Sequence, residues 1–260
     1  MRAPALSASG IGGLLSRIGA KEGAVAFADL GGGGPKTYGA LSSPYAWSSI
    51  KTVIVATLLG ELGGPSRLSA AQKSLATRAI TASDNDAAMS LFTNLKSRHG
   101  GTTAGAAGAM QRLLRRAGDS QTVVSTVGRA GFSPYGQTLW APANQVRFVA
   151  SLARGCLINT ASTEYLLGLM KSVVAGQRWG IGTLGRYPFK GGWGPDRSGG
   201  YLVRQIGLIR PQAGGGLVAV SVAVRPRNGS FASGSSQLST LAAWARQHAP
   251  RGPATRRCGG

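Results

Sequence analysis

Hydrophobic and polar positions along the chain predict strands at both ends and helices between them. The N-terminal elements that we expect are a helix at 11–19, a strand at 23–30, a glycine turn at 31–34 and a return strand near 37–41. The strand, turn and return strand together indicate a β-hairpin. An apolar block from about Ser48 to Leu62 follows and stops at Gly63-Gly64-Pro65. It is long enough for a buried helix and too short to span a membrane.

The middle of the chain has helical periodicity, and its last third returns to strands. The further helices that we expect cover 69–79, 86–96, 103–117, 143–153 and 163–174, with a loop rich in Gly, Ser and Thr at 118–136. Three strand-like runs then follow, "RYPFKGGW", "GYLVRQIGLI" and "GGLVAVSVAV", and a helix at 236–247 closes the pattern. The third run is apolar on both faces, which is typical of a central strand covered on both sides.

This order of elements predicts an α+β fold, an α/β sandwich with one antiparallel sheet made by both ends of the chain. At 260 residues the chain is long enough for a large core, and we expect one domain, 1–260. Its sheet lobe should cover about 10–46 and 177–248, with a helical lobe inserted at about 47–176. The segment 250–260 reads as a flexible tail, and the site should lie in the cleft between the lobes.

Charge changes the list of possible partners. Lys and Arg total 29 against 8 Asp and Glu, a formal net charge of +21, which favours polyanions such as nucleic acid, anionic envelope polymers or acidic lipid surfaces. The basic residues are scattered, and they approach clustering only at Arg112, Arg115 and Arg116 and in the tail at Arg251, Arg256 and Arg257. No basic helix has interleaved aromatic residues, so we do not expect nucleic-acid binding.

Cysteine and histidine are scarce. Cys156 and Cys258 are too few for a disulfide framework and lack metal-ligand spacing. We interpret Cys156, within "RGCLI", as a buried thiol, and its pairing with Cys258 stays open. The distant His99 and His248 offer little for a zinc site or a Ser-His-Asp triad, and we expect no cofactor.

The N-terminus "MRAPALSASGIGGLL" lacks the apolar core of a signal peptide. Two explanations stay open: the protein is cytoplasmic, or the leader is missing from this chain.

The segment "AWSSIKTVIVATLL" places Lys51 at the start of the apolar helix, three residues after Ser48. On a helix, residues three apart share one face, within hydrogen-bonding reach. A serine hydroxyl is a poor nucleophile until a neighbour takes its proton, and a lysine with a lowered pKa can do so. A helix N-terminus also directs free N–H groups toward a developing oxyanion. The spacing therefore indicates Ser48, not Ser49, as the nucleophile.

Two further motifs follow in the chain. Ser83-Asp84-Asn85 lies at a break between helices in "RAITASDNDAAMSLF", and Lys190-Gly191-Gly192 lies on a strand in "FKGGWGPDRSGGYLVRQIGLI". Alone, each has an ordinary explanation, a helix N-cap or an exposed strand lysine. With Ser48 and Lys51 they give the order S-x-x-K, S-D-N, K-T-G. Over most of its length the chain therefore resembles the superfamily of class A β-lactamases and penicillin-binding proteins.

The resemblance implies catalytic roles for four residues. Ser48 would form the acyl-enzyme, and Lys51 would help to deprotonate it. Ser83 would relay a proton to the leaving nitrogen. Lys190 would set the electrostatics around Ser83 and the substrate carboxylate. Asp84, between Ser83 and Asn85, is expected to brace the loop.

The resemblance also implies a substrate-binding group. Asn85 would bind the substrate's amide carbonyl, and the N–H groups of Ser48 and of Trp193, which follows Gly192, would form the oxyanion hole. The third motif departs from the family, because Lys-Gly-Gly lacks the hydroxyl that usually helps to hold the substrate carboxylate. We expect Arg204, or less favourably Arg197, to supply that contact.

A second departure concerns deacylation. Class A enzymes activate the deacylating water with a loop glutamate, but "GDSQTVVSTVGRAGFSPYGQT" contains none, even near Arg129, where the family carries one. Asp119 reads as a helix-end residue, and Glu164 is better explained by a helix N-terminus. The 35-residue interval from Ser48 to Ser83 is also shorter than in class A enzymes. We expect acylation to be retained and deacylation to be weak.

Two functions from different classes follow. The first is a serine hydrolase that forms an acyl-enzyme with β-lactams or D-Ala-D-Ala-like peptides. The second is a non-catalytic module of the same fold that binds peptidoglycan or an anionic envelope polymer. The resemblance implies an extracytoplasmic location, secreted or in the cell envelope, and we expect a monomer without a membrane span.

Overall fold

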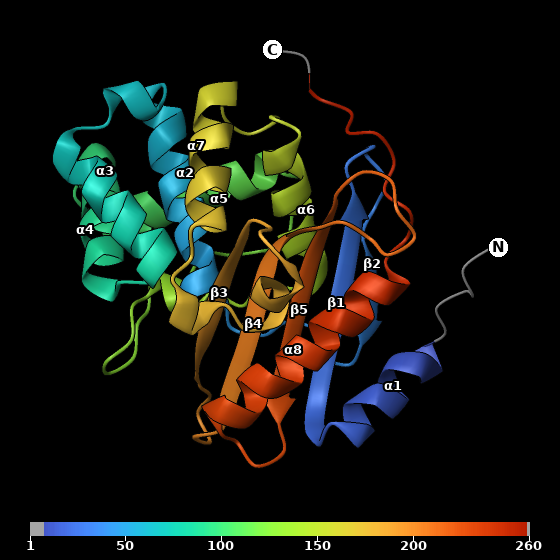
Figure 1. The fold of residues 1–260 in the computed structure, drawn as a ribbon. Coiled ribbons are helices and arrows are strands. Elements are labelled where there is room, and N and C mark those ends of the chain that lie inside the picture. The colour runs from blue at the N-terminus through green and yellow to red at the C-terminus, as the bar shows by residue number, and fades with distance from the viewer. Residues whose placement is uncertain (1–7, 259–260) are drawn as a thin grey trace.

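The computed structural model describes residues 8–258, which form one antiparallel sheet of five strands with eight α-helices (Figure 1). The elements are α1 (Ala8–Arg17), β1 (Ala20–Asp29), β2 (Lys36–Gly39), α2 (Lys51–Leu62), α3 (Ala70–Thr77), α4 (Asn85–Arg98), α5 (Thr103–Arg116), α6 (Pro142–Ala153), α7 (Thr160–Lys171), β3 (Phe189–Pro195), β4 (Tyr201–Ile209), β5 (Val218–Pro226) and α8 (Phe231–His248). The predicted α+β class is confirmed.

The sheet joins the two ends of the chain. Its strand order is β2-β1-β5-β4-β3, and β1 pairs with β5 from Ala20 opposite Pro226 to Asp29 opposite Val218. The strand β5 is central and buried along its length except at half-buried Arg225, as its two apolar faces predict. The expectation of one sheet built from both termini is therefore confirmed.

Helices cover both faces of the sheet. Side chains alternate along β1, so Val25 and Phe27 pack with α1 and α8, whereas Ala26 and Ala28 join the core of the helical lobe. Figure 1 shows α8 and α1 across the front of the sheet, with α6 behind it. The helix α6 packs directly on β1 and β5, although the predicted helical lobe, 47–176, includes it. The helix α2 is buried within the helical lobe.

Two element boundaries differ from the predictions in an informative way. The apolar helix begins as one turn of 3-10 helix, Trp47–Ile50, and becomes α-helical at Lys51. The last helix begins at Phe231, earlier than predicted, because the Ser230 side chain accepts a hydrogen bond from the N–H of Ser233 and caps it. The Gly- and Ser-rich composition of that first turn is typical of a loop, which explains the late prediction.

The segment after α8 is fixed to the domain. The N–H of Arg256 donates to the carbonyl of Leu30 at 2.8 Å, and Cys258 forms a disulfide with Cys156. The prediction of a flexible tail is therefore wrong for residues 250–258, and the interpretation of Cys156 as a free thiol is wrong as well. Residues 259–260 of the predicted tail lie outside the described residues. No helix within 8–258 has the length and hydropathy needed to cross a membrane.

Candidate active site

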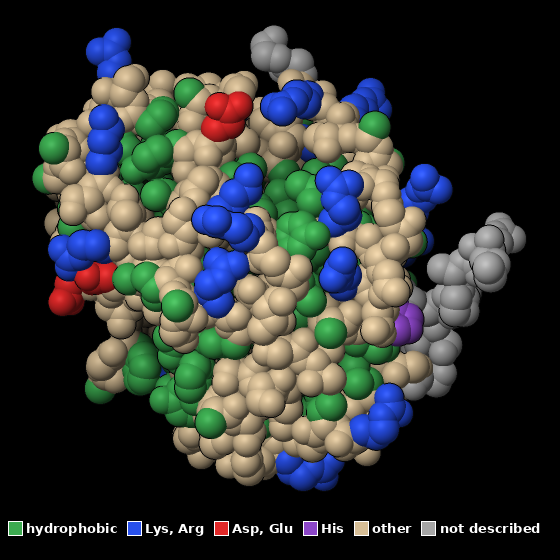
Figure 2. Space-filling view, viewed as in Figure 1, with side chains coloured by type: hydrophobic (Ala, Val, Ile, Leu, Met, Phe, Trp, Pro, Cys, Tyr) green, Lys and Arg blue, Asp and Glu red, His purple; other side chains and the backbone are tan. Residues whose placement is uncertain are grey.

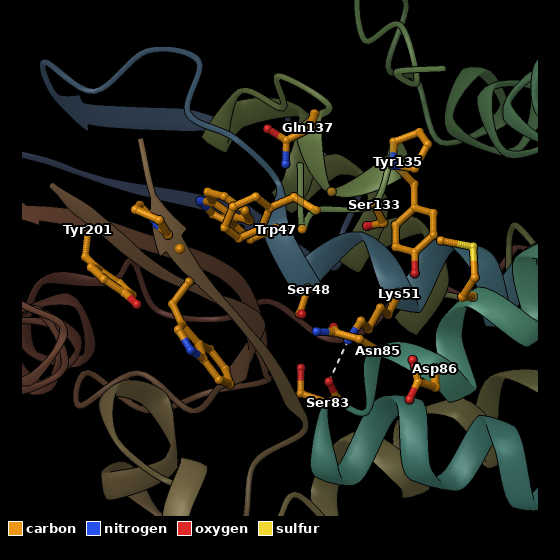
Figure 3. Close-up of a pocket in the computed structure, with 18 residues that line it drawn as sticks. Trp47, Ser48, Lys51, Ser83, Asn85, Asp86, Ser133, Tyr135, Gln137 and Tyr201 are labelled. Carbon is orange, nitrogen blue, oxygen red and sulfur yellow. Dashed lines mark hydrogen bonds between the residues drawn. The ribbon is translucent and has the colours of Figure 1, made fainter. Parts of the chain in front are cut away.

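A cleft of about 570 Å³ opens where the start of α2, the start of α4, strand β3 and the loop before α6 meet. It is lined by five of the residues that the sequence singled out: Ser48, Lys51, Ser83, Asn85 and Trp193. Figure 3 shows the labelled side chains of Ser48, Lys51, Ser83 and Asn85 gathered around one space. The structure thus brings together residues that lie far apart in the sequence.

Ser48 lies on the 3-10 turn at the start of the buried helix. The preceding residue, Trp47, has a φ of 48°, a left-handed conformation that is costly for a bulky side chain and is found mainly at functional sites. Figure 3 shows the Ser48 hydroxyl directed into the cleft. The Ser49 hydroxyl is buried and donates to the carbonyl of Ala46 at 2.6 Å. Ser49 therefore points away, as the spacing predicted.

Lys51 is buried and holds the S-D-N segment. Its Nζ donates to the carbonyl of Ser83 at 2.6 Å, drawn as a dashed line in Figure 3, and to Asn85 Oδ1 at 2.7 Å. A longer bond of 3.3 Å reaches the carbonyl of Asp84. Lys51 thus bonds to this segment, whereas the i, i+3 spacing predicted that it would pair with Ser48. Hydrogen bonds to a catalytic base are often looser in the free enzyme than in its complexes.

Burial changes the protonation of Lys51. Loss of hydration lowers the pKa of its amine to about 7, and the charge of Asp84 opposes this by favouring the ammonium form. At neutral pH, about half of the molecules therefore carry a neutral amine with a free lone pair. A neutral lysine beside a serine is what a general base requires.

The S-D-N segment is a strained turn between two helical segments. A π-helical turn, Arg78–Ala82, precedes Ser83, whose φ of 59° lies in the left-handed region. Asp84 caps α4 by accepting the N–H of Ala87 at 2.9 Å, and it forms an ion pair with Arg78. The geometry of Asp84 agrees with the structural role expected for it.

The contact with Lys51 fixes the orientation of the Asn85 amide. Asn85 presents its Oδ1 to the Lys51 amine, the orientation that the ammonium form requires because it has only donors. The amide Nδ2 of Asn85 is then free to donate on the other side. Because Asn85 lines the cleft, this donor is suited to a carbonyl oxygen of a bound molecule.

Lys190 supports Ser83 from below the cleft. It is fully buried on β3, and its Nζ donates to Ser83 Oγ at 2.8 Å and to the carbonyl of Gly191 at 3.1 Å. Burial and the nearby charge of Lys51 hold its pKa well below the usual lysine value. Since Ser83 Oγ accepts this hydrogen bond, its own hydrogen can point elsewhere. Lys190 is not among the side chains that line the cleft.

Gly192 allows β3 to approach the turn that carries Ser48. A Cβ at Gly192 would lie 2.8 Å from the carbonyl oxygen of Ala46 and 2.8 Å from the Ser49 nitrogen, both impossibly close. Gly192 itself does not line the cleft, so it contributes close packing and no substrate contact of its own. Trp193 follows it and faces the cleft. The oxyanion hole from the N–H groups of Ser48 and Trp193 stays a prediction that this close approach supports.

The missing hydroxyl of the third motif has a structural explanation. A Cβ at Gly191 would lie 3.2 Å from the indole of Trp179, which occupies the space beside this position. Trp179 also packs edge-on against Trp193, with ring centroids 5.6 Å apart. A threonine or serine at Gly191 would crowd that indole, so Trp179 and the glycine form one packing unit.

Arg204 does not reach the cleft. It is fully buried, and its guanidinium donates to the carbonyls of Pro44, Tyr45 and Trp140. The expectation that Arg204 holds the substrate carboxylate is therefore wrong, because this side chain joins β4 to two loops. Arg197 is exposed on the β3–β4 turn and does not line the cleft either.

The loop before α6 forms one wall of the cleft through residues 131–137. This wall contains no carboxylate. Asp119 is buried at the far end of the loop, where it accepts hydrogen bonds from the N–H of Thr122 and from Trp140 Nε1. Glu164 is exposed on α7 and lies outside the cleft lining. Asp119 follows the end of α5, as predicted. Glu164 lies beyond the first turn of α7, which begins at Thr160 and is capped by Asn159, so its explanation by a helix N-terminus is wrong.

Several cleft residues were missed by the sequence analysis. Asp86, in the first turn of α4, is the one carboxylate among the described residues that line the cleft. Tyr135 lies opposite and is almost fully buried, and burial raises the pKa of its phenol to about 12. Asp86 directly follows the S-D-N motif, which is a signal that could have found it. Tyr135 had no such signal, since only the fold brings its loop to the cleft.

Within residues 8–258, no three or more His, Cys, Asp or Glu side chains lie together in a way that could hold a metal ion.

This fold and this cleft together define a β-lactamase-like protein. The model of the beta-lactamase enzyme family matches residues 61–243, and the chain belongs to that family. The matched region includes the S-D-N and Lys190 motifs, whereas Ser48 and Lys51 precede it. Its membership makes the protein a hydrolase of β-lactamase type.

Solved structures agree on the fold. The chain is similar to a β-lactamase from Xanthomonas campestris, with a TM-score of 0.71 and 19% identity over 94% of this chain and 98% of that one. It is also similar to an ancestral class A β-lactamase, with a TM-score of 0.68 and 19% identity over 90% and 96%. A β-lactamase from Streptosporangium roseum has a TM-score of 0.66 and 17% identity over 92% and 98%. No curated protein sequence matches the chain significantly.

Proposed function

We propose that the protein is a serine hydrolase that forms an acyl-enzyme on Ser48 with β-lactams or D-Ala-D-Ala-like peptides. The observation that supports this most strongly is the hydrogen-bonded chain from Lys51 through the Ser83–Asn85 segment to Lys190, beside the open hydroxyl of Ser48. A structural role alone does not require two buried lysines joined to one serine, because burying cations is costly.

Acylation follows from this arrangement. The neutral amine of Lys51 takes the proton of Ser48 as the serine oxygen attacks the amide carbonyl. Asn85 Nδ2 donates to the carbonyl of the substrate's side amide and orients it. Ser83 passes its hydrogen to the leaving nitrogen and regains one from the proton that Lys51 took from Ser48, while Lys190 holds the Ser83 oxygen in place.

Charge development on the attacked carbonyl is met by backbone groups. In this proposal the N–H groups of Ser48 and Trp193 donate to the oxyanion, and Gly192 permits the close approach that they require. One well-placed donor of this kind lowers a barrier by about 3–4 kcal/mol. Acylation can therefore be efficient without a hydroxyl at Gly191.

Deacylation should be weak. Hydrolysis of the acyl-serine needs a base that takes a proton from water, and the loop wall at 131–137 provides none. The Tyr135 phenol, with its pKa raised to about 12, stays protonated and can only hold a water molecule. Lys51 would serve only in its neutral form. A stoichiometric burst followed by slow turnover is the expected kinetic behaviour.

Intact-mass spectrometry after incubation with a panel of β-lactams, including benzylpenicillin, tests the proposal. We expect one adduct on the wild type and on Ser49→Ala, and none on Ser48→Ala. The Ser49→Ala variant should lose about 1 kcal/mol of stability with its buried hydrogen bond to Ala46. Equal loss of labelling in both variants would mean that the nucleophile is assigned wrongly.

The alternative is a non-catalytic module that binds peptidoglycan or an anionic envelope polymer. The net charge of +21 is the observation that favours it. If penicillins and a fluorophosphonate both leave wild-type Ser48 unmodified, this alternative replaces the hydrolase. For either function we propose an extracytoplasmic location, because the family is typically found there and disulfides such as Cys156–Cys258 persist in oxidising compartments.

A further inference from the structure

Six arginines surround the end of the molecule that carries the C-terminal segment, and we call this surface the arginine face. Its members are Arg154 after α6, Arg210 after β4, Arg246 in the last turn of α8, and Arg251, Arg256 and Arg257 in the C-terminal segment. Figure 2 shows Lys and Arg side chains at this end of the molecule. None of the six lines the active-site cleft.

Backbone contacts join the β4–β5 turn to the C-terminal segment. Gly252 forms a parallel bridge with Gly215, and the Arg251 side chain lies 3.0 Å from where a Cβ at Gly215 would be. Arg210 donates to the carbonyl of Gly215 at 2.6 Å. Arg210 and Arg251 therefore lie around the same turn.

Further contacts bring the other arginines to this turn and segment. The carbonyl of Arg246 accepts the N–H of Gln212 at 2.9 Å, which ties the end of α8 to the same turn. Arg154 Nε donates to the carbonyl of Arg256 at 2.8 Å. The six arginines thus come from four separate parts of the chain that these contacts join.

The disulfide holds this surface in place. Cys156 lies two residues after Arg154, and Cys258 directly follows Arg257. The N–H of Cys258 also donates to the carbonyl of Arg154 at 3.1 Å. A covalent bond therefore keeps the arginines of the C-terminal segment beside Arg154.

The charges of the arginine face are uncompensated. None of its arginines takes part in an ion pair among the described residues. Asp29 accepts hydrogen bonds from the N–H groups of Gly31 and Gly33 and forms no ion pair with these arginines. All of the arginines except half-buried Arg154 are exposed. An arginine guanidinium matches the oxygens of a phosphate in a two-pronged hydrogen bond.

The residues around the arginine face limit which kind of polyanion it could bind. Neither the β4–β5 turn, 210–217, nor the segment 249–258 contains an aromatic residue that could stack on a nucleic-acid base. Nor does either contain one of the exposed large hydrophobic side chains, which would be needed to enter a lipid surface. These two segments therefore offer guanidinium groups without an aromatic or an exposed large apolar side chain.

We propose that the arginine face is a second binding site, remote from the cleft, for a linear phosphate polymer without bases. The disulfide pre-organises the site, so less ordering is needed on binding. The proposal does not depend on the chemistry of Ser48. The arginine face would attach the protein to a polymer, whereas the cleft would bind the substrate of the proposed hydrolase.

Binding of sodium polyphosphate, measured by fluorescence anisotropy over a range of salt concentrations, tests the proposal. The test variant is Arg246→Gln/Arg251→Gln/Arg257→Gln. The three arginine side chains that it replaces make no hydrogen bonds within residues 8–258. The matched control is Arg67→Gln/Lys73→Gln/Arg112→Gln, which removes the same charge from the exposed surface of the helical lobe. We expect the test variant to bind at least about ten-fold more weakly. The slope of log binding constant against log salt concentration should be smaller in magnitude by about two. The control should change affinity by less than about three-fold, because distant charges are screened.

The double variant Cys156→Ser/Cys258→Ser gives an independent comparison, since it releases the segment without changing net charge. It should weaken binding by about three-fold or more, because the flexible segment must be ordered again. Equal losses in the test and control triple variants would reduce the effect to net charge and overturn the site. Preferential binding of single-stranded DNA or of phosphatidylglycerol vesicles would overturn the choice of ligand. Circular dichroism and thermal melting check that every variant is folded.

Discussion

Lys51 combines two opposing influences on one amine. Burial favours the neutral form, whereas the charge of Asp84 favours the ammonium. Burial is the larger influence, because it lowers the pKa to about 7, where the protonated and neutral forms are both populated at neutral pH. A small change in the surroundings, such as a bound substrate, therefore strongly changes the fraction of molecules in which Lys51 is protonated.

The rate of acylation should follow the protonation of Lys51. Below pH 7 the amine is mostly protonated and cannot take the Ser48 proton, so the second-order rate should rise with pH through about 7 and then level off. The measurement is stopped-flow labelling with a fluorescent penicillin. Lys51→Ala should lower the rate by about 10²–10⁴-fold and abolish this step in the profile.

A stability measurement provides the control. The unfolded Lys51 titrates near 10.4 and the folded one near 7, so between these values the unfolded chain binds more protons. The contribution of Lys51 to the free energy of unfolding should then increase with pH across this window. If Lys51→Met unfolds with the same pH dependence as the wild type, the pKa is not shifted.

A carboxylate on the loop wall should restore turnover. Ser133 lines the cleft, so Ser133→Glu should raise the steady-state hydrolysis of a penicillin by about ten-fold or more through general-base catalysis. The measurement is the hydrolysis rate after the burst, with Ser133→Gln as the isosteric control without charge. A gain in both variants would point to loop mobility instead of a base.

The structure also corrects where such a carboxylate belongs. The sequence pointed to the neighbourhood of Arg129, but the guanidinium there lies 4.4 Å from the ring centre of Phe132 and 5.2 Å from that of Trp47. It also donates to the carbonyls of Pro195 and Asp196. Arg129 thus ties the loop to the end of β3, and replacing it would loosen the wall.

Residues could be predicted from sequence where a short motif fixes their neighbours. Ser48, Ser83 and Asn85 fall in motifs of three or four residues, and the cleft brings them together. Arg204 could not be predicted, because its direction depends on the pleat of β4 and on which loops lie beneath it. The Cys156–Cys258 bond could not be predicted either, because 102 residues separate its partners.

At the scale of elements, the site depends on how closely β3 approaches the 3-10 turn, Trp47–Ile50. Gly192 and Gly194 both lack side chains where this turn packs, since a Cβ at Gly194 would lie 2.6 Å from the Trp47 ring. The sequence predicted each element, but it contained no measure of the distance between them. The two glycines are the residues in the sequence that this close contact requires.

Gly192→Ala should therefore separate β3 from the turn. Its Cβ would meet the backbone of Ala46 and Ser49, which cannot move aside as a flexible side chain could. We expect a loss of about 1–3 kcal/mol in the free energy of unfolding and at least a ten-fold slower acylation. Gly168→Ala in α7, where no atom lies within 4 Å, is the control and should be neutral or slightly stabilising. Urea unfolding and penicillin labelling measure both effects.

At the scale of the whole molecule, the disulfide closes a long segment of chain. Cys156→Ser/Cys258→Ser should lower the free energy of unfolding by about 2–4 kcal/mol, because the unfolded chain regains the freedom that the link removes. Urea unfolding with and without a reductant measures the loss. The reductant should shift the wild type to the stability of the variant and leave the variant unchanged. Penicillin labelling should persist in both, since the bond lies away from the cleft.

The pairing of β1 with β5 has a consequence for the order in which the protein folds. A chain emerging from the ribosome presents β1 and β2 long before their partner exists, because Val25 pairs with Val222. Until β5 is made, the hairpin has an open edge that can pair with other chains. Contacts of such long sequence separation form slowly. The strand β3, which packs against the turn that carries Ser48, is also made late, so the site can be complete only after the whole helical lobe has been synthesised.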